Sequence, residues 1–125
     1  MKIKRIKIGL RPPGTIFDEA TIVLQHIESG KKVATQPEWL YFSDIRAMGK
    51  VLTPKRLELL KTIHDHHPES VRALAVLTGR DVKNVAEDLR LLASLGLVEM
   101  KENSGPNRRK TPIVNYETLS VEVHL

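Results

Sequence analysis

Hydrophobic residues recur at helical spacing in three consecutive stretches between residues 53 and 95. The first stretch opens with Thr53 and Pro54, which suit the N-cap and the first position of a helix. It closes before Pro68, because proline cannot continue a helix. The residues expected to be buried on this first helix are Leu57, Leu59, Leu60 and Ile63.

The next two stretches predict a second and a third helix. Ser70 is a favourable N-cap for the second helix, residues 78–80 with Gly79 at their centre predict a tight turn, and Asp81 can cap the third helix. The second helix is expected to bury Val71, Leu74, Ala75 and Leu77. The third is expected to bury Val82, Val85, Leu89, Leu92 and Leu95.

A pair of short strands follows the third helix. Gly96 is expected to end that helix, and residues 97–100 begin a strand. A polar loop with Gly105 and Pro106 leads to a return strand over residues 111–116, and the alternation over residues 119–125 predicts a last strand. Residues 51–125 therefore have the element order of a winged helix-turn-helix domain with a C-terminal strand.

Residues 1–50 are predicted to form a small β-α-β extension, which is a candidate dimerisation element. Ile6 and Ile8 share one face of an imperfect strand over residues 2–8, and helical spacing predicts a helix over residues 15–29. The aromatic run at residues 39–42 predicts a short buried strand, and the following single-turn helix is expected to open at Ser43 and close at Gly49. The predicted fold class of the whole chain is α+β.

Charge and composition favour a polyanionic partner. The 125 residues carry a formal net charge of +5, and Lys and Arg outnumber Asp and Glu by twelve to eight between residues 50 and 114. There is no cysteine and no apolar run as long as a membrane span, and the first eight residues alternate charge with isoleucine, unlike a signal peptide. We therefore expect a cytoplasmic protein without membrane attachment.

The third helix and the hairpin carry the side chains expected to contact DNA. Lys83 and Asn84 lie in the first turn of the third helix, where a lysine can donate to guanine and an asparagine can pair with adenine. Arg90 lies on the same exposed side, while Glu87 and Asp88 either read a cytosine or point along the protein surface. Phosphate contacts are expected from Arg72 and Arg80. The hairpin tip can reach a minor groove or contact the phosphate backbone through Asn107, Arg108, Arg109 and Lys110.

Plainer interpretations stand beside these. The charged residues of the third helix can be a solvated face, and the basic loop can serve solubility alone. His64, His66 and His67 could bind a metal, but their spacing fixes no closed coordination set, so a solvated or helix-capping role is favoured. Trp39, Tyr41 and Phe42 could line a ligand pocket, but a core or dimer contact is favoured. No cofactor is expected, and no catalytic set is recognisable, so an enzyme has little support.

The segments at residues 52–60, 70–75, 83–92 and 95–99 resemble the MarR-like winged-helix putative DNA-binding proteins. More narrowly, with residues 42–46 and 112–116, the chain is similar to the subgroup that acts as antitoxins beside TumE-type toxins. The resemblance implies a dimeric transcriptional regulator that binds a palindromic operator, often in its own promoter. The antitoxin subgroup would add a toxin partner, neutralised by direct binding.

The chain departs from typical MarR proteins, which flank this domain with long dimerising helices and form a small-phenolic-ligand pocket between them. Here the N-terminal part is mixed and the tail is predicted to be a strand, so the N-terminal segment and the last strand are expected to pair with each other or across a dimer. The favoured function is a sequence-specific regulator of double-stranded DNA, acting as an autoregulating repressor and antitoxin. The alternative is a protein-interaction winged helix whose main role is to bind a partner such as a toxin.

Overall fold

The computed structural model describes residues 5–10, 39–102 and 109–123, and within them it contains five strands and four helices. The α+β fold class is therefore confirmed. The chain divides into two compact units. Unit 1 comprises residues 1–53 and 116–125, and unit 2 comprises residues 54–115. Among the described helices, none combines the length and the apolar character needed to cross a membrane.

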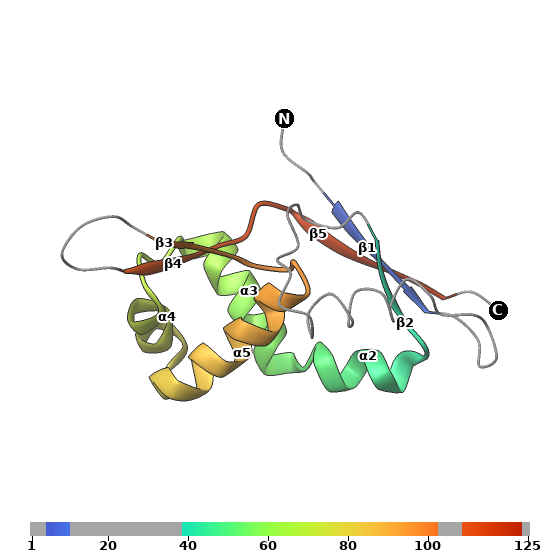
Figure 1. The fold of residues 1–125 in the computed structure, drawn as a ribbon, viewed down its shortest axis with the longest axis horizontal. Coiled ribbons are helices and arrows are strands. Elements are labelled where there is room, and N and C mark those ends of the chain that lie inside the picture. Colours follow the sequence, from blue (N-terminus) through green and yellow to red (C-terminus); the bar gives the residue numbers. More distant parts are fainter. Residues whose placement is uncertain (1–4, 11–38, 103–108, 124–125) are drawn as a thin grey trace. The chain divides into compact units, whose positions relative to one another are not determined.

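Unit 1 contains a three-stranded parallel sheet (Figure 1). Strand β1 (Arg5–Leu10) lies between β2 (Trp39–Phe42) and β5 (Thr118–Val123). The pairing of the N-terminal segment with the last strand, one of the two expected arrangements, is thus found within the chain. The sequence-based division placed this last strand with the C-terminal domain, whereas its pairing with β1 groups it with unit 1. The helix predicted over residues 15–29 lies outside the described residues.

One face of this sheet is apolar. The other face is mixed, since it carries Trp39 and Tyr41 of β2 as well as polar residues of β1 and β5. Successive side chains of a strand point to opposite faces, and partners in register share a face. Ile6, Ile8 and Leu10 of β1 are buried, and the register places Leu40 and Phe42 of β2 beside them. On the other side of β1, the same face is continued by Leu119, Val121 and Val123 of β5.

The short helix α2 (Ile45–Val51) follows β2. Its N-cap is Asp44, whose side chain accepts a hydrogen bond of 2.7 Å from the backbone N–H of Ala47, so the cap lies one residue after the predicted Ser43. The prediction that Gly49 closes the helix is wrong. Glycine ends a helix when it adopts a left-handed conformation, and Gly49 does not have a positive φ, so the helix continues to Val51.

Unit 2 consists of three helices and a two-stranded antiparallel sheet (Figure 1). The helices are α3 (Pro54–His66), α4 (Val71–Thr78) and α5 (Val82–Ser94). The strands are β3 (Glu99–Glu102) and β4 (Lys110–Ile113). All three helices begin within one residue of the predicted cap.

The core of unit 2 is built from the inward sides of the three helices and the turn after α5. Its buried residues include Leu59, Leu60, Ile63, Leu74, Ala75, Val85, Leu89, Leu92, Leu95, Leu97 and Val98. Three residues predicted to be buried are not: Leu57, Leu77 and Val82 are exposed by 41%, 51% and 37%. Leu57 and Leu77 lie at the margins of stripes centred on other residues, and Val82 is the first residue of its helix. Val71 is half-buried.

The hairpin strands are displaced from the predicted ranges. Residues 97–100 were expected to begin β3, but the strand begins at Glu99. The backbone N–H of Leu97 donates to the carbonyl of Leu92 over 3.0 Å, and Gly96 has a φ of 80°, so Leu97 still belongs to the turn that ends α5. Leu97 and Val98 are buried in the core instead of being paired in the sheet.

His67 ends α3 in a left-handed conformation, with a φ of 49°, and its N–H donates to the carbonyl of Ile63. A residue with a Cβ is strained there, so His67→Gly is expected to raise the unfolding free energy by about 1 kcal/mol. His66→Gly is the matched control, because it places glycine at the last residue of α3, where the φ is not positive, and should lower stability by less than about 1 kcal/mol. Chemical denaturation measures both, and a loss of stability in both variants would contradict the prediction.

Candidate functional site

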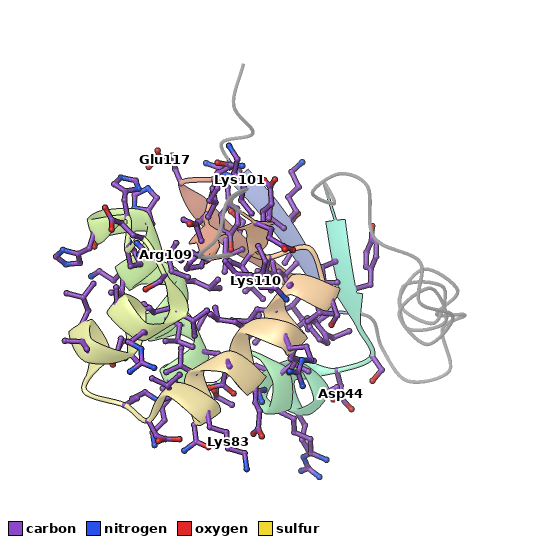
Figure 2. The ribbon with its side chains drawn as sticks, turned by 60° about the vertical axis from the view of Figure 1, so that its left-hand side comes forward. Asp44, Lys83, Lys101, Arg109, Lys110 and Glu117 are labelled. Atoms are coloured by element: carbon purple, nitrogen blue, oxygen red, sulfur yellow. The ribbon has the colours of Figure 1, made fainter. Side chains whose placement is uncertain are left out.

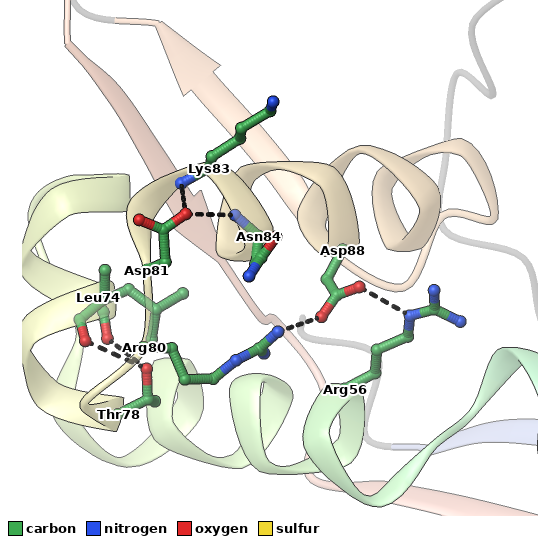
Figure 3. Close-up of polar contacts among 9 residues, drawn as sticks. Arg56, Leu74, Thr78, Arg80, Asp81, Lys83, Asn84 and Asp88 are labelled. Atoms are coloured by element: carbon green, nitrogen blue, oxygen red, sulfur yellow. Dashed lines mark hydrogen bonds and ion pairs between the residues drawn. The ribbon is translucent and has the colours of Figure 1, made fainter.

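Local hydrogen bonds cap both ends of α4 and fix the connection from α4 to α5. Ser70 Oγ accepts from the N–H of Ala73 at the start of α4. At the end of α4, Gly79 adopts a φ of 66°, and the N–H of Arg80 donates to the carbonyl of Ala75 over 3.0 Å. Thr78 Oγ1 donates to the carbonyl of Leu74 over 3.0 Å (Figure 3). The turn between the two helices is therefore fixed by the backbone and its nearest side chains.

Asp81 caps α5 and places the two residues predicted to contact bases. Its Oδ2 accepts from the N–H of Lys83 over 3.1 Å and from the N–H of Asn84 over 3.4 Å (Figure 3). Lys83 and Asn84 are exposed, and the Lys83 side chain extends away from the helix (Figure 2). Because the carboxylate occupies these two N–H groups, they are not open to a phosphate, and an anion would have to be bound by side chains.

The exposed face of α5 is mixed in charge. Lys83, Glu87 and Arg90 follow one another at spacings of four and three residues, so they share a face opposite the buried Val85 and Leu89. Neither Lys83 nor Arg90 has an ion-pair partner within the described part of the chain. Glu87 lies between them in this row, so the face carries only a small net positive charge.

Arg80 is not placed as the sequence suggested. Its Nη2 lies 2.8 Å from Asp88 Oδ2, and Arg56 Nε lies 3.1 Å from Asp88 Oδ1 (Figure 3). The side chains of Arg56, Arg80 and Asp88 are only 21%, 18% and 16% exposed. Arg80 is therefore directed into a contact between α5, the turn before it and the start of α3, which leaves little of its guanidinium for a phosphate.

Asp88 is ionised in this network. Burial acts to raise the pKa of its carboxyl, but the hydrogen bonds from Arg80 and Arg56 outweigh burial and hold the pKa below the ordinary value of 3.8. Arg80 Nη1 is buried and has no hydrogen-bond partner among the described residues. Asp88 thus compensates two partly buried guanidinium groups, one of which is not fully satisfied.

The hairpin carries the second group of predicted contacts. Lys110 is the first residue of β4, is exposed and is paired in register with Glu102 of β3. Arg109 Nη1 lies 3.3 Å from Glu69 Oε2, and Thr111 Oγ1 donates to the backbone carbonyl of Glu69 over 2.8 Å. The start of β4 is therefore attached to the loop before α4. The predicted contacts Asn107 and Arg108 lie outside the described residues.

Arg72 completes the set, in the first turn of α4, with an exposed side chain that has no ion-pair partner among the described residues. Sequence reasoning missed Glu69 as the partner of Arg109 and Arg56 as a partner of Asp88. These pairs are separated by 40 and 32 residues along the chain, and no local pattern joins residues at such distances.

The histidines form no metal centre within the described ranges, where no group of three or more His, Cys, Asp or Glu side chains is arranged to hold an ion. His64 Nδ1 lies 2.8 Å from Asp65 Oδ1, and this hydrogen bond lowers the pKa of Asp65. His66 and His67 are exposed and His67 follows the last residue of α3, which fits the favoured solvated or helix-capping role. In β2, Tyr41 and Phe42 are half-buried and point to opposite faces of the sheet.

Replacing Asp88 by asparagine should destabilise the protein, because Arg56 and Arg80 would remain partly buried without a counter-charge. We expect Asp88→Asn to lower the unfolding free energy at pH 7 by about 2 kcal/mol. The pKa of Asp88 in the folded protein lies below its ordinary value of 3.8. The stabilisation from the ionised carboxylate is therefore fully present above pH 3.8 and is lost as the pH falls through the folded pKa. The difference between the two proteins should therefore shrink at pH 3.

Chemical denaturation at pH 7 and pH 3 measures both effects. Glu87→Gln is the matched control, because Glu87 is an exposed acid of the same helix and should change stability by less than about 0.5 kcal/mol. Equal effects of Asp88→Asn and Glu87→Gln would contradict the structural role of the network.

Comparisons with known proteins add one finding. A search of curated proteins gave no match. The model of a protein family described as HVO_A0114 matches residues 51–121, which is more than half of the chain. This match includes all of α3, α4 and α5, both strands of the hairpin and the first part of β5. The chain therefore belongs to the HVO_A0114 family.

Proposed function

We propose that unit 2 is a winged helix-turn-helix domain that binds double-stranded DNA and makes this protein a sequence-specific transcriptional regulator. In this proposal α4 and α5 form the helix-turn-helix, α5 is the recognition helix, and β3 and β4 form the wing. The observation that carries the proposal is the first turn of α5. Asp81 caps it, and Lys83 and Asn84 project from it into solvent.

The geometry of this turn suits the major groove, because recognition helices contact base edges with their N-terminal residues. Lys83 can donate to guanine and Asn84 can pair with adenine. Arg90 lies two turns further on the face of Lys83, where it suits a phosphate. Arg72, Arg109 and Lys110 are assigned to phosphates as well. Arg80 is assigned to the Asp88 network instead of to DNA.

The biological role proposed for this domain is that of an autoregulating repressor, with the antitoxin role as its specific form. The resemblance to MarR-like proteins and to the antitoxins of TumE-type toxins supports this assignment. A regulator of this kind would bind an operator upstream of its own coding sequence. The natural probe is therefore the duplex from that region, compared with a scrambled duplex of equal length.

A second candidate function is supported by the apolar surface of α4. Val76 and Leu77 of α4 are exposed by 76% and 51%. Large exposed aliphatic side chains favour contact with a protein. In this alternative the domain mainly binds and neutralises a partner protein, such as the product of a neighbouring gene.

The variant Lys83→Ala tests the role of α5. If Lys83 contacts a base, the change should weaken binding to the upstream duplex by about tenfold or more and have a much smaller effect on the scrambled duplex. Lys61→Ala is the matched control, since it removes the same charge from an exposed position on α3. Fluorescence anisotropy at fixed salt measures both. An equal loss from Lys61→Ala and Lys83→Ala would mean that only net charge matters.

The ion pair of Arg109 with Glu69 leads to a prediction in the opposite direction. Glu69→Gln should release Arg109 for phosphate and strengthen binding by about two- to fivefold, the range of an exposed ion pair. The gain should be similar on both duplexes, because phosphate contacts carry no sequence information.

Glu58→Gln controls for the change in net charge, because Glu58 is exposed on α3 and has no ion pair among the described residues. Arg109→Ala should abolish the gain from Glu69→Gln. If the gain persists without Arg109, this residue does not contact DNA. If Arg109→Ala with Lys110→Ala leaves DNA binding unchanged while Val76→Lys prevents copurification of the neighbouring gene product, the protein-binding alternative replaces the first.

A further inference from the structure

Strand β5 forms one edge of the three-stranded sheet of unit 1. It pairs with β1 on one side, and the described part of the chain places no strand on its other side (Figure 1). Val121 and Val123 are exposed by 48% and 61%. Their register partners Ile8 and Leu10 are buried on the same face of the sheet. The apolar face of the sheet is thus left open at the β5 edge.

This edge lacks the features by which edge strands avoid further pairing. Such strands commonly carry lysine, proline or a bulge. Residues 118–123 contain neither lysine nor proline, and their one charged residue, Glu122, lies on the mixed face. Strand β4 of unit 2, in contrast, carries Lys110 and Pro112. Within the described ranges, the β5 edge therefore has no strand paired to its outer backbone N–H and C=O groups, and an exposed apolar row lies beside them.

We propose that β5 pairs antiparallel with β5 of a second copy of this chain, across a two-fold axis centred on Val121. The two three-stranded sheets would then join into one continuous sheet. In this register Val121 faces Val121 of the second copy, and Leu119 faces Val123. A two-fold interface requires a surface that is complementary to itself, and this register places every apolar residue of β5 against another apolar residue.

The polar face of the strand is compatible with the same register. Glu122 would face Ser120 of the second copy, so no two like charges are opposed. Centring the axis on Glu122 would oppose two carboxylates, which is destabilising. Centring it on Ser120 would place Val123 opposite Glu117. A two-fold axis placed between two neighbouring residues would set each apolar residue of β5 opposite a polar residue of the second copy. Among axes centred on Ser120, Val121 and Glu122, charge and face together thus select Val121.

This inference does not rest on the proposed DNA binding, because it concerns unit 1 alone and is measured without DNA. Light scattering coupled to size exclusion should give the full chain twice its mass of 14.1 kDa. Val121→Lys should give the monomer mass, because two ammonium groups would meet at the axis. Val76→Lys is the matched control, since it replaces another exposed valine in the other unit, and it should remain dimeric.

A cysteine scan tests the register and does not depend on how Val121→Lys folds. The chain contains no cysteine, so a single introduced cysteine can form a disulfide only between copies. Directly opposed strand residues lie within disulfide range, whereas diagonal neighbours lie about 7–8 Å apart, beyond it. Val121→Cys should therefore give a covalent dimer on mild oxidation, and Ser120→Cys should remain uncrosslinked.

A monomer mass for the wild-type protein would overturn the proposal. A Val121→Lys protein that is folded and dimeric would overturn it as well. Equal crosslinking of Val121→Cys and Ser120→Cys would exclude the Val121 register.

Discussion

The carboxylate of Asp88 receives Arg56 from the start of α3 and Arg80 from the turn before α5. Each contact is modest by itself, but together they connect three segments of unit 2 through one partly buried group. Removing the carboxylate would leave two partly buried cations with reduced hydration and no counter-charge. The loss of stability on removing one partner of such a network is therefore larger than the net stability that the intact network contributes. This contact adds a polar connection between α5 and α3 to the apolar packing of Val85, Leu89 and Leu92.

The same network reduces the positive charge available to a partner. Arg80 and Arg56 are committed to Asp88, Arg109 is paired with Glu69, and Glu87 lies between Lys83 and Arg90 on the exposed face of α5. The +5 is the charge of the whole chain, whereas unit 2 has eleven Lys and Arg against eight Asp and Glu, a balance of +3. Of the predicted DNA contacts, Arg72, Lys83 and Arg90 are exposed and have no ion-pair partner among the described residues, so these cations remain for contacts with phosphates or bases.

Local signals in the sequence predicted much of the fold. Ser70 and Asp81 cap their helices as expected, Gly79 makes the turn, and Val85, Leu89 and Leu92 form the buried side of α5. What depends on distant contacts was not predicted. The inward direction of Arg80 requires Asp88, and the attachment of Arg109 requires Glu69, 40 residues away. The parallel pairing of β1 and β5 joins the two ends of the described chain, and hydrophobic alternation alone could not decide between pairing within one chain and across two.

The most direct test of the account is to map DNA contacts onto the backbone. In amide chemical-shift experiments with isotope-labelled protein, a duplex from the region upstream of the coding sequence should perturb the start of α5 most strongly. Lys83 and Asn84 should lead, followed by Arg90 and the hairpin residues Arg109 and Lys110, while β5 should change little. Perturbations confined to unit 1, or none that distinguish this duplex from a scrambled one, would contradict the assignment of unit 2 as a sequence-specific DNA-binding domain.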